Sequence, residues 1–396
     1  MKIMHLCLYG PYTDHFSYQE NILPRYHKSF GHDVVVVARN LCFDYEGKEM
    51  ETDTGSYFDE YGIKVIRVKY REIFINRLTE RFADVPMEEI LKTEKPDLIF
   101  IHDAHRTSLS YLKVADYVRH HESCALLGDI HNDFYNSHVE EEKKKSPIRK
   151  LYNHLINGYF KKHVISKYRK IYCVAQSCYD YAKDYLKINP DQLELLPLGF
   201  DTYLIEQKDK ALIRRNFREK YGFKENDIVV AHGGKLDKKK RSIELIDSLK
   251  RLKSENIKLV VFGGIVEEYK NEMNKRLEEC ADWIVYLGPL KQDEYYDVFL
   301  SCDIAVFPGG QSSLWQEAIG CGLPLIVYHL DGKTDYLNRC GNVVFVESQD
   351  EEGIYPVLRD TLNKNELSLL KNAANNASAF FSYREEANKI IEDSKH

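Results

Sequence analysis

The chain has 396 residues, of which 43% are hydrophobic and 30% are charged. This composition excludes collagen-like, low-complexity and wholly disordered proteins, and the length predicts two domains. The net charge of −6 argues against a general nucleic-acid binder, so no nucleic acid is expected as a partner. No apolar run reaches the length of a membrane helix, and Gly10-Pro11 interrupts the start before a signal-peptide core could form, so we expect a soluble, cytoplasmic protein.

The nine cysteines are scattered along the chain, and no two of them have the CxxC spacing. Their odd number and wide spacing indicate neither a disulfide framework nor a zinc site. We expect reduced thiols that are mostly packed in the interior.

The first half alternates short β-rich segments with helical patterns, which is typical of parallel sheets with crossover helices. Gly31 stands where a helix C-cap is needed, directly before an apolar run that suits a strand covered on both faces. The elements expected here are strands over 2–8, 33–38, 63–68, 97–102 and 125–128 and helices over about 17–30 and 106–120.

A charged stretch separates this half from a second alternation of the same kind. Near the end of the chain, Ser382 and Glu385 have the spacing of a capping box and predict a terminal helix. We therefore expect two α/β domains, 1–197 and 198–380, followed by a helical segment over 381–396. The elements expected in the second domain are strands over 227–231, 258–262, 283–287, 304–307, 324–328 and 342–346 and helices over about 242–252, 266–279, 292–301 and 312–321.

Ligands of such sheets bind beyond the carboxyl ends of the strands, so residues that follow strands are the first candidates for a site. Gly234, Lys235 and Lys240 follow the strand expected over 227–231. Glycine lets a ligand approach the backbone closely and lysine supplies a compact cation, so this segment suits a diphosphate. A solvated, lysine-rich loop is the alternative interpretation.

A second segment combines a strand, a glycine loop and a helix that opens with serines. Hydroxyls and free amides at such a helix start would bind an anion. Glu317 lies about one and a half turns into the expected helix, where a carboxylate could accept both hydroxyls of a ribose. An ordinary helix start with a surface glutamate is the alternative. The residues expected to bind the anion are Gly310, Gln311, Ser312 and Ser313.

Together these segments resemble the retaining nucleotide-sugar glycosyltransferases of the GT-B fold, family 4, over almost the whole chain. The family's Gly-Arg/Lys-Leu pattern with a later lysine matches 234–236 and Lys240, and its Glu-Ala-x-x-x-Gly-x-Pro pattern matches 317–324. The resemblance implies two Rossmann-like domains that face each other across a cleft, with the C-terminal helix returning to the first domain. It also implies that Lys235 and Lys240 clamp the donor diphosphate and that Glu317 binds the ribose.

The same resemblance implies roles for two further residues. It places the backbone near Leu290 against the nucleobase, and it gives His131 a catalytic position facing the donor sugar. Two features depart from the family pattern, and the first is Gly309, which stands where a second glutamate is usual. The paired glycines that usually follow the first strand are also absent.

The loop after the first strand is where acceptor-binding residues are expected. Asp14 and His15 are candidates for contact with the acceptor, and the aromatic side chain of Tyr12 suits a sugar or a lipid-linked saccharide. Ser17 stands close to the place of the family's paired glycines. Farther along, the His-Asp-Ala-His run over 102–105 suggests a metal, but hydrogen-bonded turn residues are the commoner case, and we expect no metal.

The segment 143–170 has a charge pattern of its own. It carries ten lysines and arginines and no aspartate or glutamate, interleaved with leucine, isoleucine and aromatic residues. This pattern predicts a basic amphipathic helix that suits an anionic membrane surface, which would place the protein at the inner face of the plasma membrane. The alternative is a solvated helix whose apolar residues face the core.

These observations predict a retaining glycosyltransferase that moves a sugar from a nucleoside-diphosphate sugar to a hydroxyl of a saccharide or lipid-linked saccharide, in the synthesis of cell-surface polysaccharide or glycoconjugate. No metal or other cofactor is expected, since lysines and backbone amides would stabilise the departing diphosphate. Two alternatives stay open. One is a GT-B sugar-nucleotide epimerase, which needs acid-base groups around a sugar ring and no acceptor. The other is an inactive GT-B partner subunit, suggested by Gly309.

Overall fold

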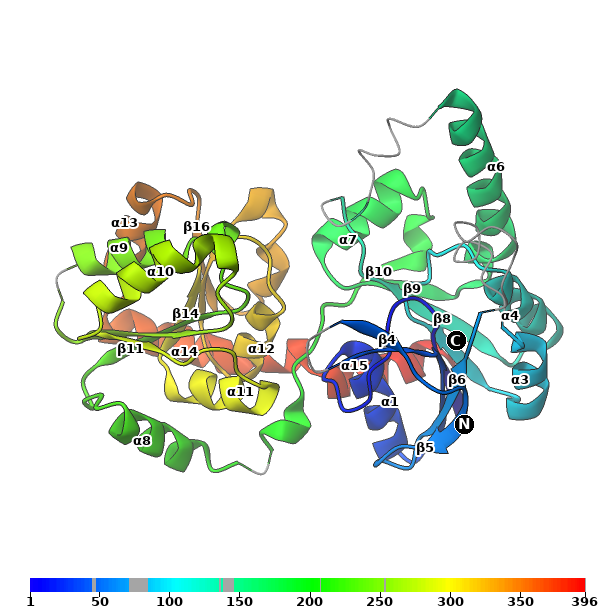
Figure 1. Cartoon of the computed structure of the whole chain (residues 1–396), viewed down its shortest axis with the longest axis horizontal. Helices are drawn as coiled ribbons and strands as arrows, with labels where there is room; N and C mark the ends of the chain where they lie inside the picture. The colour runs from blue at the N-terminus through cyan, green and yellow to red at the C-terminus, as the bar shows by residue number, and fades with distance from the viewer. Residues whose placement is uncertain are drawn as a thin grey trace. The chain divides into compact units, whose positions relative to one another are not determined.

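The computed structural model of the chain describes residues 1–44, 48–70, 85–134, 137, 146–206, 208–252 and 254–395. The chain forms two compact units: the first comprises Met1–Pro197 with Glu386–His396, and the second comprises Leu198–Glu385. Each unit is built on one mainly parallel sheet with helices on its faces (Figure 1). The molecule is therefore an α/β protein made of two Rossmann-like units.

The sheet of the first unit has eight strands in the order β10-β9-β8-β7-β1-β2-β6-β5. All neighbours are parallel except β5, which pairs antiparallel with β6. The strands are β1 Lys2–Cys7, β2 Asp33–Arg39, β5 Gly55–Phe58, β6 Lys64–Val68, β7 Leu98–Ile101, β8 Ala125–Ile130, β9 Lys170–Cys173 and β10 Leu193–Leu195, with a separate hairpin of β3 Leu41–Phe43 and β4 Glu49–Glu51. The helices are α1 Gln19–Ser29, α3 Met87–Glu94, α4 Leu109–His120, α6 Pro147–His163 and α7 Gln176–Asp180.

The sheet of the second unit has six parallel strands in the order β13-β12-β11-β14-β15-β16. Its strands are β11 Ile228–Gly233, β12 Ile257–Phe262, β13 Ile284–Tyr286, β14 Ile304–Phe307, β15 Leu325–Tyr328 and β16 Val343–Val346. Helices α9 Ser242–Arg251, α10 Glu267–Glu279 and α13 Glu351–Thr361 cover one face, and α8 Lys210–Lys220, α11 Gln292–Ser301, α12 Leu314–Gly320 and α14 Lys364–Ala377 cover the other (Figure 1). Burial on both faces explains why the central strands are continuous apolar runs.

The last helix, α15 Tyr383–Asp393, packs against the first unit. The Ser382 hydroxyl accepts a hydrogen bond from the Arg384 amide at 3.2 Å, which satisfies one of the free amides at the start of the helix. Further on, the Tyr172 hydroxyl donates to Asp393 at 2.7 Å, and Arg169 donates to the Ser394 carbonyl at 2.7 Å. These bonds fix the end of the chain beside β9.

Candidate functional site

In both sheets, two central strands are followed by connections that leave in opposite directions. In the second unit the chain runs outward from β11 to β12 and β13, then returns to β14 and runs the other way to β15 and β16. Ligands of open α/β sheets bind at such a switch point, beyond the carboxyl ends of the strands. The loop after β11 and the loop after β14 are therefore placed side by side at the position where a ligand is expected.

The loop after β11 is shaped by close backbone contacts. Gly234 has a φ of 113°, and Gly263 after β12 has a φ of 114°. A Cβ added at Gly263 would lie 1.8 Å from the Gly234 carbonyl oxygen, so only glycine fits there. The glycine-containing loops after β11 and β12 thus pack directly on each other.

The two lysines of this loop have different surroundings. Lys235 is exposed, whereas Lys240 is partly buried and its Nζ donates to the carbonyl oxygens of Gly310 at 3.2 Å and Gln311 at 2.7 Å. Burial lowers the pKa of Lys240, which Asp237 opposes. Lys240 therefore ties the loop after β11 to the loop after β14, and its ammonium group is held at the carboxyl edge of the sheet.

Gly309 is the position where the family pattern has a glutamate, and the structure gives a physical reason for the glycine. A Cβ built on Gly309 would lie 2.2 Å from the Lys239 carbonyl oxygen and 2.6 Å from the Cα of Lys240. The next amide, that of Gly310, donates to the same Lys239 carbonyl at 2.8 Å. The backbone of the lysine loop occupies the space beside residue 309, so no side chain fits there in this conformation.

The serines expected to open a helix are placed differently from the prediction. The helix α12 begins at Leu314, not at Ser312, and it is seven residues long. Ser313 has helical backbone angles and makes no side-chain cap, while Ser312 accepts a hydrogen bond from the Leu314 amide at 3.4 Å. Ser312 also lies near Gly234, 3.9 Å from the position a Cβ would take there. The loop, rather than a capped helix start, brings these residues to the switch point.

Glu317 is buried in α12, with 8% of its surface exposed, which excludes the alternative of a surface glutamate. Tyr295 and Gln292 on α11 hydrogen bond to its carboxyl group. Its Oε2 has no hydrogen-bond partner among the residues that the structure describes. Burial raises the pKa of Glu317 to about 8, although these hydrogen bonds favour the charged form. A buried, unsatisfied carboxylate oxygen is costly, which is expected where a ligand completes the site.

Three residues that hold this site were not identified from the sequence. Tyr295 and Gln292 lie on a helix that was expected, but the pattern did not show that they meet Glu317. His232 in β11 bonds the Val306 carbonyl at 2.7 Å and the Ser242 hydroxyl at 2.8 Å, so it joins β11, β14 and the start of α9. Burial lowers the pKa of His232 to about 4, and the ring is neutral.

The half-buried Leu290 lies after β13, two residues beyond Gly288.

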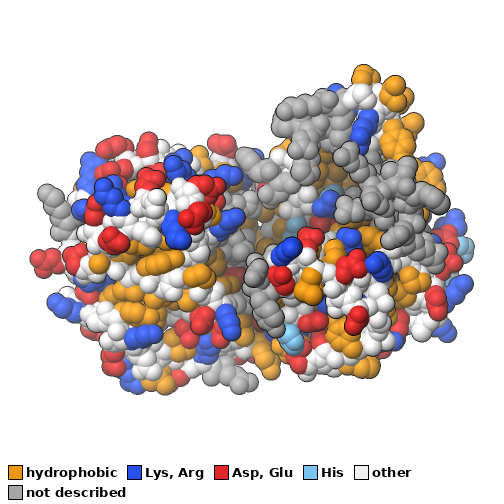
Figure 2. All heavy atoms as spheres, viewed as in Figure 1, with side chains coloured by type: hydrophobic (Ala, Val, Ile, Leu, Met, Phe, Trp, Pro, Cys, Tyr) orange, Lys and Arg blue, Asp and Glu red, His pale blue; other side chains and the backbone are white. Residues whose placement is uncertain are grey.

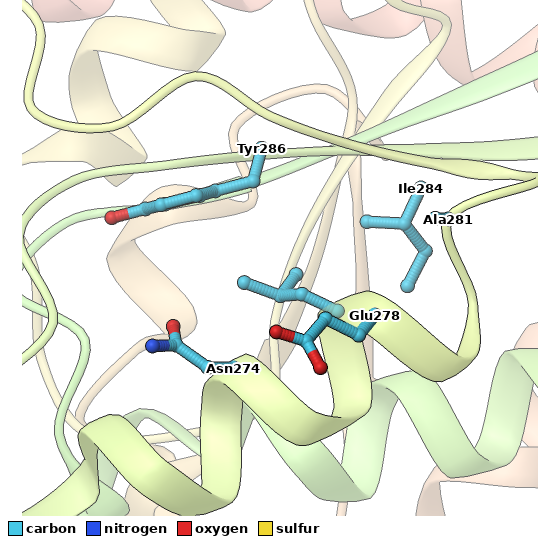
Figure 3. A pocket seen from close by; sticks show the side chains of 6 residues that line it. Asn274, Glu278, Ala281, Ile284 and Tyr286 are labelled. Atoms are coloured by element: carbon cyan, nitrogen blue, oxygen red, sulfur yellow. The ribbon is translucent and has the colours of Figure 1, made fainter.

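A pocket of about 290 Å³ lies elsewhere in the second unit (Figure 3). The α10 and β13 segments form it, and the side chain of Tyr286 extends over it. It includes none of the residues predicted to bind the donor, and β13 is the edge strand of the sheet. This pocket is therefore not our candidate site. Its lining residues are Asn274, Leu277, Glu278, Ala281, Ile284 and Tyr286.

In the first unit, His131 follows β8 at the carboxyl edge of the sheet, with 35% of its side chain exposed. Its Nε2 lies 3.4 Å from Oδ1 of the fully buried Asp129. Burial alone would lower the pKa of His131, but the Asp129 carboxylate raises it to about 9. Asp129 also accepts from the Asp103 amide at 2.9 Å and lies 2.9 Å from Nδ1 of His102. His131 is thus an imidazolium at neutral pH.

Ligand atoms of His102, Asp129 and His131 lie within 4.8 Å of one another, close enough to suit a metal ion. The hydrogen bonds among these three side chains account for that spacing, and the remaining ring nitrogen of His102 is bonded to His5 at 3.2 Å. The cluster thus needs no ion to explain its spacing, and the expectation that no metal binds stays a prediction.

The four residues expected to bind an acceptor lie in the loop after β1, but one of them is not at the surface. Tyr12 is 4% exposed and belongs to the hydrophobic core, beneath the guanidinium of Arg67, so its ring is not available to an acceptor. Asp14 accepts from Arg67 at 3.0 Å and from Tyr57. His15 and Ser17 are exposed, and Nδ1 of His15 lies 3.0 Å from Glu60.

The helix α6 contains the described part of the basic segment; Lys143, Lys144 and Lys145 lie outside the described residues. Asn153 and Phe160 are its buried residues, while several of its apolar side chains are exposed, which favours the amphipathic helix over the alternative in which they face the core. Figure 2 shows hydrophobic side chains at the upper end of the first unit, where Figure 1 places α6. Among the described residues, no helix is long and apolar enough to cross a membrane. The exposed apolar residues are Ile148, Leu151, Tyr152, Leu155 and Tyr159.

Comparison with known proteins agrees with this geometry. The family described as glycosyl transferases group 1 matches residues 213–380, and the family described as glycosyltransferase family 4 matches residues 22–204. The two matches together span most of both units. This chain belongs to the family 4 glycosyltransferases. It is therefore a glycosyltransferase enzyme. No curated protein matches the sequence significantly.

Solved structures share the GT-B fold of this glycosyltransferase at low sequence identity. HepE from Anabaena, in complex with UDP and glucose, is 15% identical with a TM-score of 0.63, and the match covers 99% of this chain and 98% of that one. A glycosyltransferase from Rickettsia africae is 14% identical with a TM-score of 0.68, covering 100% and 97%. Sucrose-phosphate synthase from Thermosynechococcus elongatus is 14% identical with a TM-score of 0.62, covering 99% and 97%.

The contact between Gly309 and the lysine loop gives a prediction about stability. Gly309→Ala places a methyl group 2.2 Å from a backbone oxygen, so the two loops must separate. We expect the free energy of unfolding to fall by about 1–3 kcal/mol, measured by urea denaturation. Gly310→Ala is the matched control, because the nearest atom to its added methyl would be 3.8 Å away. Equal stability of Gly309→Ala and the wild type would contradict the close contact.

Proposed function

We propose that the enzyme transfers a sugar, with retention of its anomeric configuration, from a nucleoside-diphosphate sugar to a hydroxyl of a saccharide or lipid-linked saccharide. The observation that carries the proposal is Glu317, whose buried Oε2 has no hydrogen-bond partner among the described residues. A ribose supplies two neighbouring hydroxyls, which are the donors that this carboxylate needs. HepE, a protein of the same fold, was solved in complex with UDP, which supports a nucleotide as part of the donor.

The lysines of the loop after β11 suit the diphosphate of that donor. When the bond to the sugar breaks, the diphosphate leaves with additional negative charge, and positive groups fixed in advance stabilise that charge. Lys240 is held in place by two carbonyl oxygens, and Lys235 is exposed beside the glycines that leave the backbone open. We assign both lysines to the departing diphosphate, so the proposed reaction needs no metal or other cofactor.

The first unit supplies the remaining groups of the proposal. We assign His131 to the donor sugar, as the family resemblance implies, and its positive charge suits a partner that carries phosphate oxygens. For the acceptor we keep Asp14, His15 and Ser17 and omit Tyr12, since its ring lies in the core. The leaving phosphate oxygen accepts the proton of the attacking hydroxyl, so no protein base is required.

The enzyme would reach a lipid-linked acceptor at a membrane surface, and α6 has a face that suits binding to such a surface. Ile148 is 82% exposed and Leu155 is 63% exposed, at helical positions that fall on one side. Arg149, Lys150 and Lys162 are exposed on the same helix, and the segment 143–170 has no acidic residue to oppose them. We propose that this face binds anionic lipids at the inner face of the plasma membrane, in the synthesis of cell-surface polysaccharide or glycoconjugate.

The raised pKa of Glu317 makes donor binding depend on pH. Ribose hydroxyls favour the carboxylate, so binding must release the proton that the buried group holds below pH 8. Affinity for the donor is therefore expected to rise with pH, by up to about tenfold per unit, and to level off above the pKa. Isothermal titration calorimetry from pH 6 to pH 9 measures this affinity, with the nucleoside-diphosphate sugar that binds most tightly in a panel of such donors.

Glu317→Gln is expected to weaken donor binding by roughly 10- to 150-fold at pH 8.5, the equivalent of about 1.5–3 kcal/mol for a lost hydrogen bond to a charged group. The variant should also lose the pH dependence. Glu278→Gln, in the pocket beside α10, is the matched control and should bind as the wild type does. Unchanged affinity in Glu317→Gln, or no binding of any donor by the wild type, would contradict the proposed function.

The α6 face predicts binding to vesicles that contain anionic lipid. The double variant Leu151→Asp and Leu155→Asp should lose co-sedimentation with such vesicles, because it places two charges on the apolar face. Leu369→Asp, on a side chain of the second unit that is 66% exposed, should bind as the wild type does. Binding by the wild type should weaken as salt is added. If the double variant still co-sediments with the vesicles, or if co-sedimentation does not depend on the charge of the lipid, the α6 face is not the membrane-binding surface.

A further inference from the structure

Three histidines form a continuous hydrogen-bonded row in the interior of the first unit. His5 in β1 and His27 in α1 are fully buried, and His102 after β7 is 8% exposed. The row ends at one side on the carbonyl oxygen of Ala387 in α15 and at the other on the carboxylate of Asp129. The four contacts, in order, are His27 Nε2 to the Ala387 oxygen at 3.2 Å, His5 Nε2 to His27 Nδ1 at 3.0 Å, His5 Nδ1 to His102 Nε2 at 3.2 Å and His102 Nδ1 to Asp129 Oδ2 at 2.9 Å.

Counting protons shows what this row must hold. Each contact needs one hydrogen, and both end groups are acceptors when Asp129 is ionised, so the rings must supply four hydrogens. Three neutral imidazoles supply only three, because each neutral ring carries a single N–H. The row therefore satisfies all of its contacts only if one ring is an imidazolium. With three neutral rings, one buried contact would place two lone pairs against each other.

The position of the additional proton follows from the surroundings. Burial and the neighbouring rings lower the pKa of His5 well below its ordinary value, and burial lowers the pKa of His27 to about 3. Of the three rings in the row, only His102 contacts the Asp129 carboxylate, whose negative charge compensates a positive charge on that ring. In that arrangement His27 and His5 each carry hydrogen on Nε2, and His102 carries hydrogen on both nitrogens.

We propose that the row of His5, His27 and His102, here called the histidine relay, is a positioning device for His131. The relay holds one proton more than three neutral rings do, and this proton gives His102 a positive charge. The charge on His102 keeps Asp129 ionised, and His131 directs its Nε2 toward that carboxylate. The three histidines come from separate elements, β1, α1 and the segment after β7. They act on His131 only through Asp129.

The C-terminal helix controls the proton count. If His27 had no acceptor at Nε2, every hydrogen could point toward Asp129, and three neutral rings would satisfy the remaining contacts. The Ala387 carbonyl is the group that requires the fourth hydrogen. The docking of α15 on the first unit is thereby linked to the charge beside His131.

Other titratable groups face the relay and His131 from the surrounding elements. Burial raises the pKa of Glu20 and of Glu386, which favours their neutral forms, and burial lowers the pKa of His105 to about 4. Asp103 carries the remaining acidic charge near His131. The groups that face the relay or His131 are Glu20 and His32 at α1, Asp103 and His105 after β7 and Glu386 in α15.

The experiment is nitrogen NMR of the histidine rings in the intact protein at pH 8, which distinguishes protonated from unprotonated ring nitrogens. In the wild type we expect hydrogen on both nitrogens of His102 and only on Nε2 of His5 and His27. Three neutral rings would overturn the proposal. The spectra are repeated with a chelator, and a change at His102 would show that the cluster binds a metal, which would also overturn it.

His27→Phe gives the second test, because it removes the contact with Ala387 and keeps a ring in the core. His102 should become neutral with hydrogen on Nδ1 alone, although His27 does not bond to it, and His5 should shift its hydrogen from Nε2 to Nδ1. Losing a cation beside Asp129 should then raise the pKa of His131 further. A general loosening of the fold would instead lower that pKa toward its ordinary value of 6.5. His121→Gln, at an exposed histidine that follows α4, is the control and should change none of these signals.

The role of the relay in sugar transfer rests on the proposed function, but the proton count does not. The two fail separately, because donor binding is measured through Glu317 in the second unit and the relay through ring nitrogens in the first. If both hold, the kcat of His27→Phe should show its alkaline limb at a higher pH than the wild type, with donor affinity unchanged. An alkaline limb that moves to lower pH would contradict the positioning role.

Discussion

The backbone of the lysine loop rests directly on the backbone of the glycine loop after β14, and the organisation of the proposed donor site depends on that contact. The Gly310 amide donates to the Lys239 carbonyl, and the Lys240 ammonium group returns to the Gly310 and Gln311 carbonyls. The contact is possible because the two loops leave the adjacent strands β11 and β14 at the switch point of the sheet. It fixes a cation at the carboxyl edge of the sheet and excludes any side chain at Gly309. The departure from the family pattern is thus a packing requirement of this loop pair.

Two buried carboxylates show how this glycosyltransferase uses burial in opposite ways. Desolvation opposes the ionisation of Glu317, and no cation among the causes of its pKa shift offsets this. The pKa of Glu317 therefore rises, and the carboxyl group keeps its proton until a ligand binds. Asp129 is buried more completely, yet its pKa is lowered, because His131 and His102 surround it and outweigh desolvation. The first arrangement suits recognition of neutral hydroxyls, and the second maintains a cation at His131. Neighbouring charge, more than burial, decides which state each carboxylate adopts.

The sequence predicted both sheets because alternating apolar runs and helical patterns are local signals. It also located the loops after β11 and β14, since glycines and lysines after a strand are visible in one dimension. It did not predict the short strands β5, β9 and β10, which are too short to show a clear periodicity, or the burial of Tyr12, which depends on the side of the loop that meets the core. The histidine relay was not recognised either. His5, His27 and His102 are separated in the chain, and only the neighbouring positions of β1, α1 and β7 bring them together.

The central claim is that a nucleoside diphosphate binds at the switch point of the second unit. Hydrogen exchange of the intact protein, measured with and without the nucleoside diphosphate that binds most tightly, tests it most directly. The account predicts slower exchange of backbone amides in the loops over 234–241 and 308–313, and of those around Glu317, with no change at α10. Slower exchange confined to α10 and β13, around the pocket there, would contradict it.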